Sequence, residues 1–145
     1  MGSLPAVAVF LLVPPLAGQS LDERAIGFAK ALPVSRLDAR MPRQPFDAWF
    51  QKLVGSQAKV TWETNDCGEQ TGSPADAQRD FPICVEVGAA LADGRKVAVQ
   101  IAVGTFQKGI SGRPVVWWAA IEDHGSTEHV RRLRDLAAAL KTAGR

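Results

Sequence analysis

The chain has 145 residues, which is enough for one compact domain, and its 46% apolar and 22% charged residues exclude a wholly disordered protein. The formal net charge of +2 is too small to indicate a nucleic-acid or membrane partner. The charge is unevenly placed. Residues 60–94 carry seven acidic groups and one basic group, whereas the segments on both sides are basic. We expect these basic flanks to neutralise the acidic segment in the folded protein.

Residues 1–20 have the pattern of a signal peptide. The apolar run 6–13 is too short to span a bilayer, and two prolines end it. Small residues at Ala17 and Ser20 offer cleavage positions, although no Lys or Arg precedes the run, so that an uncleaved anchor stays open. We therefore predict an exported protein, periplasmic or secreted, with residues 21–145 as a single domain and no membrane contact after cleavage.

Two helices are expected before the β region. Leu21–Leu32 has apolar residues at three- and four-residue spacing and acidic residues in its first turn, and Pro33 ends it. A second helix is expected over Pro45–Val54, because proline suits a first helical position and Gly55 suits the position after the end. Its core face would consist of Phe46, Trp49, Phe50 and Leu53.

Four strands are expected next, since apolar residues alternate with polar or small ones over 59–64, 83–91, 97–103 and 114–122. Asp93-Gly94 predicts a tight hairpin turn. Residues 104–113 are expected to form a loop. The inward-facing residues would be Val85, Val87, Val97, Val99, Ile101, Val115, Trp117 and Ile121.

The last element is expected to be a helix that begins at Ser126 as N-cap. Its apolar stripe would consist of Val130, Leu133, Leu136, Ala137 and Leu140. Because short connections join the strands in sequence, we predict an α+β fold: a four-stranded antiparallel meander with the helices packed on one face. Trp49, Phe50, Leu133 and Leu140 would meet the inward face of the sheet.

Cys67 and Cys84 are the chain's two cysteines, so they can pair with each other or with another molecule. The spacing is not the C-x-x-C of a redox enzyme, and there is no second pair to complete a metal site. We predict a structural disulfide that closes the acidic loop between them.

No catalytic residue, metal or cofactor is predicted. His124 and His129 are five residues apart, which does not place two ligands on one helical face. The glycines of 104–109 are spaced as in a phosphate-binding loop, but Ile110 stands where its lysine would be. The acidic loop has oxygen ligands of the kind that Ca²⁺ prefers, yet its spacing matches no EF-hand, so we expect a solvated loop.

The outward face of the predicted sheet is unusual, because a solvent-facing strand side normally carries larger polar groups. Its floor would consist of Gly88, Ala90, Ala98, Ala102 and Ala120. Around that floor would lie Thr61, Glu86, Gln100, Val116 and Trp118. Such a face is suited to being covered, either by the first helix, by a second copy of the chain, or by a ligand or partner.

The run Trp62–Gly72, which contains Asn-Asp-Cys-Gly-Glu-Gln-Thr-Gly, is followed by Asp80–Glu86, Asp-Phe-Pro-Ile-Cys-Val-Glu, and by Asp93-Gly94-Arg95. This pattern resembles small exported bacterial proteins to which no activity is assigned. It covers about a third of the chain. The resemblance implies export and the disulfide, and nothing catalytic.

The sequence favours a non-enzymatic binding or inhibitor-like module. Binding would use either the acidic loop, through Asp66, Glu69, Asp76 and Asp80, or the outward sheet face, through Trp118, Gln100, Glu63 and Glu86. The partner would be a basic protein surface or a small ligand, and a homodimer is a further possibility. The alternatives are a small hydrolase that uses Glu63 and Glu86, and a structural or assembly subunit. A concave pocket around Glu63, Glu86 and Trp118 would favour the enzyme, and a protruding loop over a flat face would favour the binding module.

Overall fold

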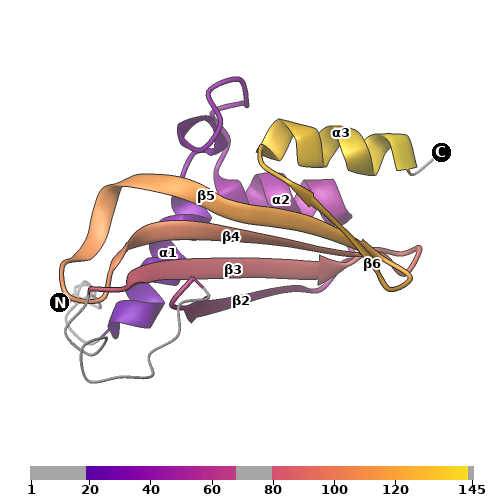
Figure 1. Cartoon of the computed structure of the whole chain (residues 1–145). Helices are drawn as coiled ribbons and strands as arrows, with labels where there is room; N and C mark the ends of the chain where they lie inside the picture. Colours follow the sequence, from indigo (N-terminus) through magenta and orange to yellow (C-terminus); the bar gives the residue numbers. More distant parts are fainter. Residues whose placement is uncertain (1–18, 68–79, 144–145) are drawn as a thin grey trace, which may run out of the picture.

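The computed structural model describes residues 19–67 and 80–143 of the chain (Figure 1). Its helices are α1 (Leu21–Ala31), the 3-10 helix η3 (Val34–Arg36), α2 (Phe46–Val54) and α3 (Leu133–Ala143). Its strands are β2 (Val60–Asn65), β3 (Pro82–Ala90), β4 (Lys96–Thr105), β5 (Gly109–Asp123) and β6 (Ser126–Val130). Most of the predicted signal segment, residues 1–18, lies outside the described residues.

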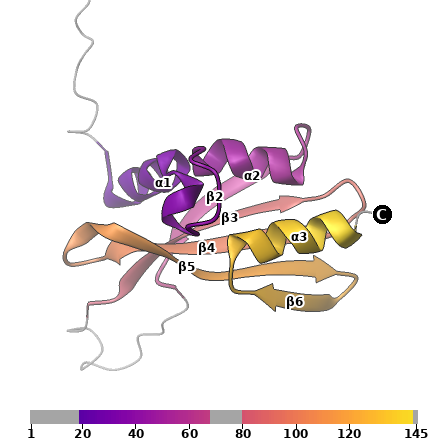
Figure 2. The ribbon, with the colours of Figure 1, turned by 90° about the horizontal axis from the view of Figure 1, so that it is seen from above.

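The strands form one antiparallel sheet in the order β2-β3-β4-β5-β6. Helices α1, α2 and α3 lie on the same face of this sheet, as the view from above shows (Figure 2). The predicted α+β class and the antiparallel sheet are confirmed. The predicted number of four strands is wrong, because a fifth strand follows β5.

The two N-terminal helices form where predicted because each has local start and stop signals. The Glu23 amide donates a hydrogen bond to the Ser20 hydroxyl (3.1 Å), and the Ser20 amide donates one to the Glu23 carboxylate (2.9 Å). Helix α2 begins directly after Pro45 and ends at Gly55, whose φ of 112° favours glycine. The segment between the helices folds back on itself through a bridge between Pro33 and Pro45.

Phe46 of α2 is the centre of the aromatic core. Its ring centroid lies 5.6 Å from that of Trp49 and 5.9 Å from that of Phe50. It also lies 6.0 Å from the ring centroid of Trp62, edge to face. Because Trp62 belongs to β2, this contact attaches an edge strand of the sheet to the helical layer. The ammonium group of Lys30 from α1 lies over the same indole ring, 5.4 Å from its centroid.

The inner face of β3 and β4 is buried as the alternation predicts. Val85, Val87, Val97, Val99, Ile101 and Ile121 all belong to the core, where they meet Trp49, Phe50, Leu133 and Leu140. The prediction fails at two positions on β5. Val115 is 53% exposed and Trp117 is 46% exposed.

A β-bulge on β5 causes this error. Trp118 is opposite Gln100, but the next residue of β4, Ile101, is opposite Val116, so Trp117 is an extra residue without a partner. The alternation of faces is therefore shifted by one residue before the bulge. Val116, predicted on the outer face, packs against the core, and Val115 turns outward.

The prediction of a loop over residues 104–113 is wrong, because these residues form the turn and the adjoining strand ends of a hairpin. β4 extends to Thr105 and β5 begins at Gly109, with three residues between them. Gly109, the first residue of β5, has φ of 82°, a backbone conformation that favours glycine. A Cβ at Gly104 would collide with the Gly109 carbonyl, so Gly104 is explained by the close approach of two strands.

The predicted helix start at Ser126 is also wrong. Ser126–Val130 pairs with the end of β5, where Asp123 is opposite Ser126 and Ala119 is opposite Val130. The two residues between the strands, His124 and Gly125, both have positive φ (49° and 87°), as a two-residue hairpin requires. The sheet hydrogen bonds with β5 therefore outweigh the local N-cap signal at Ser126.

Helix α3 begins at Leu133, where a residue distant in the sequence supports it. The backbone amide of Arg134 donates a hydrogen bond to the Asp38 carboxylate (3.2 Å). The Arg134 guanidinium also lies 3.7 Å from that carboxylate. A carboxylate at this position satisfies a free backbone amide and complements the helix dipole. The connection that follows η3 thus determines where the last helix starts.

The bulge can be tested with two neighbouring valines. We expect Val116→Ala to lower the free energy of unfolding by about 1–3 kcal/mol, because Val116 packs against the core, and Val115→Ala to change it by less than about 0.5 kcal/mol. Urea unfolding of both variants measures the difference. A strand without the bulge predicts the opposite order of the two losses.

Candidate functional site

The strand register arranges the outer face of the sheet into rows of side chains. One row runs from Thr61 through Gly88 and Ala98 to Ala120, and then to His129 on β6. Because the three central residues are small, this row forms a low floor. No helix of the described chain covers the floor, since all three helices lie on the opposite face (Figure 1). The expectation that Leu21–Leu32 packs over the outer face is therefore wrong, because Ala25 and Ala29 of α1 are part of the core.

Aromatic side chains border one side of this floor. The indole of Trp118 and the imidazole of His129 meet edge to face, with 6.1 Å between ring centroids. On the other side, the hydroxyl of Thr61 lies 3.4 Å from the Gly88 carbonyl, to which it donates. The floor therefore lies between an aromatic wall on β5 and β6 and a hydroxyl group on β2.

The space between these walls is a cavity of about 540 Å³. We call this cavity the outer-face pocket, and its floor is Gly88, Ala98 and Ala120. At the end nearest the β3–β4 hairpin it is lined by Lys59, Lys96, Glu122 and Thr127. Four of the five residues of the predicted small-residue floor line this pocket, and Ala102 does not. The volume lies within the range of about 300–1,000 Å³ that ligand sites occupy.

Sequence reasoning missed five of the residues that line the pocket: Lys59, Lys96, Glu122, Thr127 and His129. His129 was expected in the first turn of a helix. It lies instead on β6, opposite Ala120. The signal that could have placed it is Gly125, because glycine at the second position of a two-residue turn favours a hairpin. Lys59 directly precedes β2 and Lys96 begins β4, and only the strand register brings the two lysines to one end of the floor.

Gln100 and Glu86 lie in the row next to the floor, together with Trp118. The Gln100 amide donates to the Glu86 carboxylate at 2.8 Å, and the side chain of Asn65 donates to the same oxygen at 3.4 Å. Gln100 is only 6% exposed, and its carbonyl oxygen has no hydrogen-bond partner among the described residues. This buried acceptor is therefore unsatisfied beside the aromatic wall.

The predicted pair of carboxylates is brought together, but not into the pocket. Glu63 is directly opposite Glu86 in the β2–β3 register. Glu63 is exposed, and Glu86 already accepts the two hydrogen bonds described above. Neither residue lines the outer-face pocket. The concavity thus contains Trp118 without the two carboxylates that a hydrolase would use.

The disulfide is confirmed: Cys67 and Cys84 are bonded, with their Cα atoms 4.9 Å apart. Cys67 has a positive φ of 57°, and its backbone amide donates a hydrogen bond to the side-chain oxygen of Asn65 (2.8 Å). Asn65 is also opposite Cys84 in the sheet. The disulfide therefore ties the end of β2 to the beginning of β3 and stands at the base of the acidic loop.

The acidic loop residues have different outcomes. Glu69 and Asp76 lie outside the described residues. Asp66 is described and makes no hydrogen bond or ion pair with another described side chain. Asp80 is not a free binding group. Its carboxylate accepts hydrogen bonds from the Thr105 hydroxyl (2.6 Å) and the Gln107 amide (2.8 Å). Asp80 thus holds the turn between β4 and β5.

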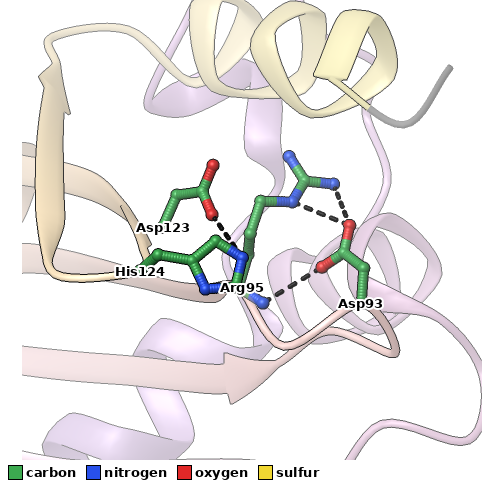
Figure 3. Close-up of polar contacts among 4 residues, drawn as sticks. All are labelled: Asp93, Arg95, Asp123 and His124. Carbon is green, nitrogen blue, oxygen red and sulfur yellow. Dashed lines mark hydrogen bonds and ion pairs between the residues drawn. The ribbon is translucent and has the colours of Figure 1, made fainter.

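Arg95 makes the clearest ion pair on the helix side of the sheet. Its Nε and Nη2 lie 2.8 Å and 2.7 Å from Asp93 Oδ2, and its backbone amide donates to Asp93 Oδ1 at 3.0 Å (Figure 3). These hydrogen bonds lower the pKa of Asp93 and raise the pKa of Arg95. The pair holds the predicted hairpin turn at Asp93-Gly94.

A second cavity of about 140 Å³ lies beside Arg95, under Ala139 of α3. The Nη1 of Arg95 is buried and has no hydrogen-bond partner within residues 19–67 and 80–143. Asp123, which pairs with His124 at 3.3 Å (Figure 3), and Glu128 also line this cavity. Two carboxylates beside one guanidinium disfavour an anion there, so we assign this space no ligand.

Two further findings concern chemistry and membranes. Over residues 19–67 and 80–143, no group of three or more His, Cys, Asp or Glu side chains is placed to hold a metal ion. Within the same residues, no helix has the length and apolar character needed to cross a membrane.

Comparison of the chain with protein-family models, with curated proteins and with solved structures found no match.

The disulfide can be tested directly. Replacing both cysteines, as Cys67→Ser with Cys84→Ser, is expected to lower the free energy of unfolding by about 2–4 kcal/mol, because the unfolded chain is no longer cross-linked. Urea unfolding measures the loss. Reduction of the unmodified protein is the control and should produce a similar loss, whereas a reductant should not affect the double variant. A loss below about 1 kcal/mol would contradict a stabilising role.

Asp80 predicts a pH dependence of stability. The Thr105 hydroxyl, the Gln107 amide and the charge of Lys108 hold the pKa of Asp80 below its usual value of 3.8. A lowered folded-state pKa contributes stability above pH 3.8, and this contribution is lost as pH falls through the lower folded pKa. Asp80→Asn should therefore be less stable than the unmodified protein near neutral pH. The difference should disappear in acid.

The control for this experiment is Asp66→Asn, because Asp66 has no polar contact with another described side chain. Thermal unfolding of both variants and of the unmodified protein at a series of pH values provides the comparison. A stability difference that is present near neutral pH and disappears in acid is expected for Asp80→Asn and not for Asp66→Asn. A difference for Asp80→Asn that stays constant from neutral pH down through pH 3 would show that the Asp80 carboxylate is not held in its charged form.

Proposed function

We propose that the protein is a non-enzymatic binding protein that takes a small, mainly apolar ligand in the outer-face pocket. One observation carries this proposal: a cavity of about 540 Å³ lies over a floor of Gly88, Ala98 and Ala120, on a sheet face that no described helix covers. A solvent-facing sheet normally carries larger polar side chains. Here the small residues produce depth that the fold itself does not require, and a mainly apolar concavity is the usual form of a ligand site.

The geometry favours a flat ligand. Small side chains at three adjacent strand positions present a plane, and Trp118 stands at its edge in contact with His129. A ring or chain that lies on this floor would contact the indole and be removed from water, at about 25 cal/mol for each Å² of apolar surface buried. Tryptophan is among the side chains that contribute most at binding sites.

Hydrolysis receives less support than binding. A general acid or base must reach the reacting group directly or through one water. Glu63 and Glu86 are outside the pocket lining, and Glu86 is engaged by Gln100 and Asn65. The acidic loop is not developed further as a binding surface, since two of its four predicted acidic residues lie outside the described residues.

Export remains part of the proposal. The disulfide between Cys67 and Cys84 supports an oxidising compartment, the periplasm or the exterior of the cell. Ser20 caps α1, so cleavage after Ala17 would keep the cap in the mature domain, whereas cleavage after Ser20 would remove it.

The proposal can be tested with N-phenyl-1-naphthylamine, an uncharged fluorescent probe whose emission rises in apolar sites. We expect saturable binding by the full chain and at least about tenfold weaker binding by Trp118→Ala, because the aromatic wall is lost. Trp117→Ala is the matched control. That tryptophan is the neighbouring residue, 46% exposed and outside the pocket, so its removal should leave the affinity unchanged.

A second variant separates loss of the wall from loss of the cavity. Ala98→Leu adds bulk to the floor of an open concavity, so the protein should remain folded while the probe is excluded. Equal affinities for the unmodified protein, Trp118→Ala and Ala98→Leu would overturn the assignment of the pocket. Binding that disappears with increasing protein concentration, as a dimer forms, would show that a second copy of the chain covers this face.

A further inference from the structure

The end of the outer-face pocket nearest the β3–β4 hairpin is charged. Lys59 precedes β2 and Lys96 begins β4, and both line the pocket. Glu122 lines it as well, and is opposite Lys96 in the β4–β5 register. Within the described part of the chain, neither lysine forms an ion pair. Two ammonium groups against one carboxylate leave this end of the pocket with a net charge of +1.

The opposite direction along the sheet has the other sign. The row beyond the floor contains Glu63 opposite Glu86, two carboxylates on adjacent strands. Gln100, in the same row, donates a hydrogen bond to Glu86, but as a neutral side chain it does not cancel the charge of that carboxylate. An anion would therefore be repelled at this side and attracted at the lysine end. A bound anion would therefore have one preferred orientation, with its charged group toward the lysine end.

From this arrangement we infer that the ligand is a flat amphipathic anion. Its apolar frame lies on Gly88, Ala98 and Ala120 against Trp118, and its negatively charged group lies between Lys59 and Lys96. This inference rests on the proposed function and adds the ligand's charge and orientation. A carboxylate, sulfonate or phosphate group would satisfy the two ammonium groups equally well by charge.

Glu122 limits the strength of this selection without reversing it. Opposite charges on neighbouring strands attract, so the Glu122 carboxylate offsets part of the positive charge of Lys96. Lys59 is on the far side of β3 from Glu122, because β3 separates β2 from β4. The anionic group is therefore expected nearer to Lys59, where no described carboxylate of the pocket lining competes.

A matched pair of probes tests the inference. 8-Anilinonaphthalene-1-sulfonate has the same ring frame and N–H as N-phenyl-1-naphthylamine and adds one sulfonate group. Fluorescence titration of the full chain should give about three- to tenfold tighter binding of the sulfonate at about 0.01 M salt. The ratio of the two affinities should decrease towards 1 as the salt concentration rises to about 1 M, because the Debye length falls from about 30 Å to about 3 Å over this range.

Removing the charges should remove the preference and nothing else. Lys59→Gln with Lys96→Gln is expected to bind both probes equally and to keep the affinity for the uncharged one. The matched control is Lys52→Gln with Lys141→Gln, two exposed lysines of α2 and α3 on the opposite face of the sheet, which should retain the full preference. Retained binding of the uncharged probe also shows that the lysine variant is folded.

The outcomes separate this inference from the proposed function. If both probes bind equally to the unmodified protein, or if the preference survives in Lys59→Gln with Lys96→Gln, the assignment of an anionic ligand is wrong and the pocket itself is unaffected. If neither probe binds, or if Ala98→Leu binds the sulfonate as well as the unmodified protein does, the pocket is not the site and both proposals fail.

Discussion

Helices α1, α2 and α3 bury their apolar faces against one side of a five-stranded sheet, and this single-sided packing determines the rest of the molecule. The β-branched residues of β3 and β4 point toward the helices, since alternate residues of a strand must face opposite sides. The residues between them are consequently directed to the other side. There the chain has Gly88, Ala98 and Ala120 in one row. The pocket is thus produced by the absence of side-chain bulk on a face that no described helix covers.

Because of the bulge at Trp117, β5 contributes Val116 to the core and Trp118 to the outer face of the sheet. Between Ala119 and Glu122 the strand keeps its regular alternation, so Trp118 stands on the outer face beside Ala120. Beyond the extra residue the faces exchange, which returns Val116 to the core. An unbulged strand would have buried the exposed Val115 in its place. One local irregularity therefore keeps an aromatic wall at the pocket while the core remains filled.

Several polar residues hold this frame and have no direct part in the pocket. Asp38 supports the start of α3, Asp80 holds the β4–β5 turn, and Asp93 with Arg95 holds the β3–β4 turn. The disulfide performs the same task at the other end of β3. Acidic side chains that a sequence reading assigns to binding are in part engaged as acceptors for backbone and hydroxyl groups. This is the common use of carboxylates at turns and helix ends.

The sequence by itself determined those parts of the fold for which the evidence is local. Helical periodicity with Pro33, Pro45 and Gly55 at the helix boundaries placed α1 and α2. Alternation placed the inner faces of β3 and β4, and Asp93-Gly94 placed their turn. The cysteine count led to the correct disulfide, since Cys67 and Cys84 had no other partner within the chain. The small-residue floor was also visible, because residues two apart share a strand face.

Only the tertiary structure decided the remainder, because it depends on partners distant in the sequence. Whether Ser126–Val130 is strand or helix is set by hydrogen bonds to β5, which a local N-cap signal does not reveal. The bulge at Trp117 is a property of two strands together, so alternation within one strand could not predict it. The convergence of Lys59, Lys96 and His129 on one floor follows from the register of four strand pairs. Periodicity indicates which face a residue shares with its neighbours, and pairing determines which residues meet across that face.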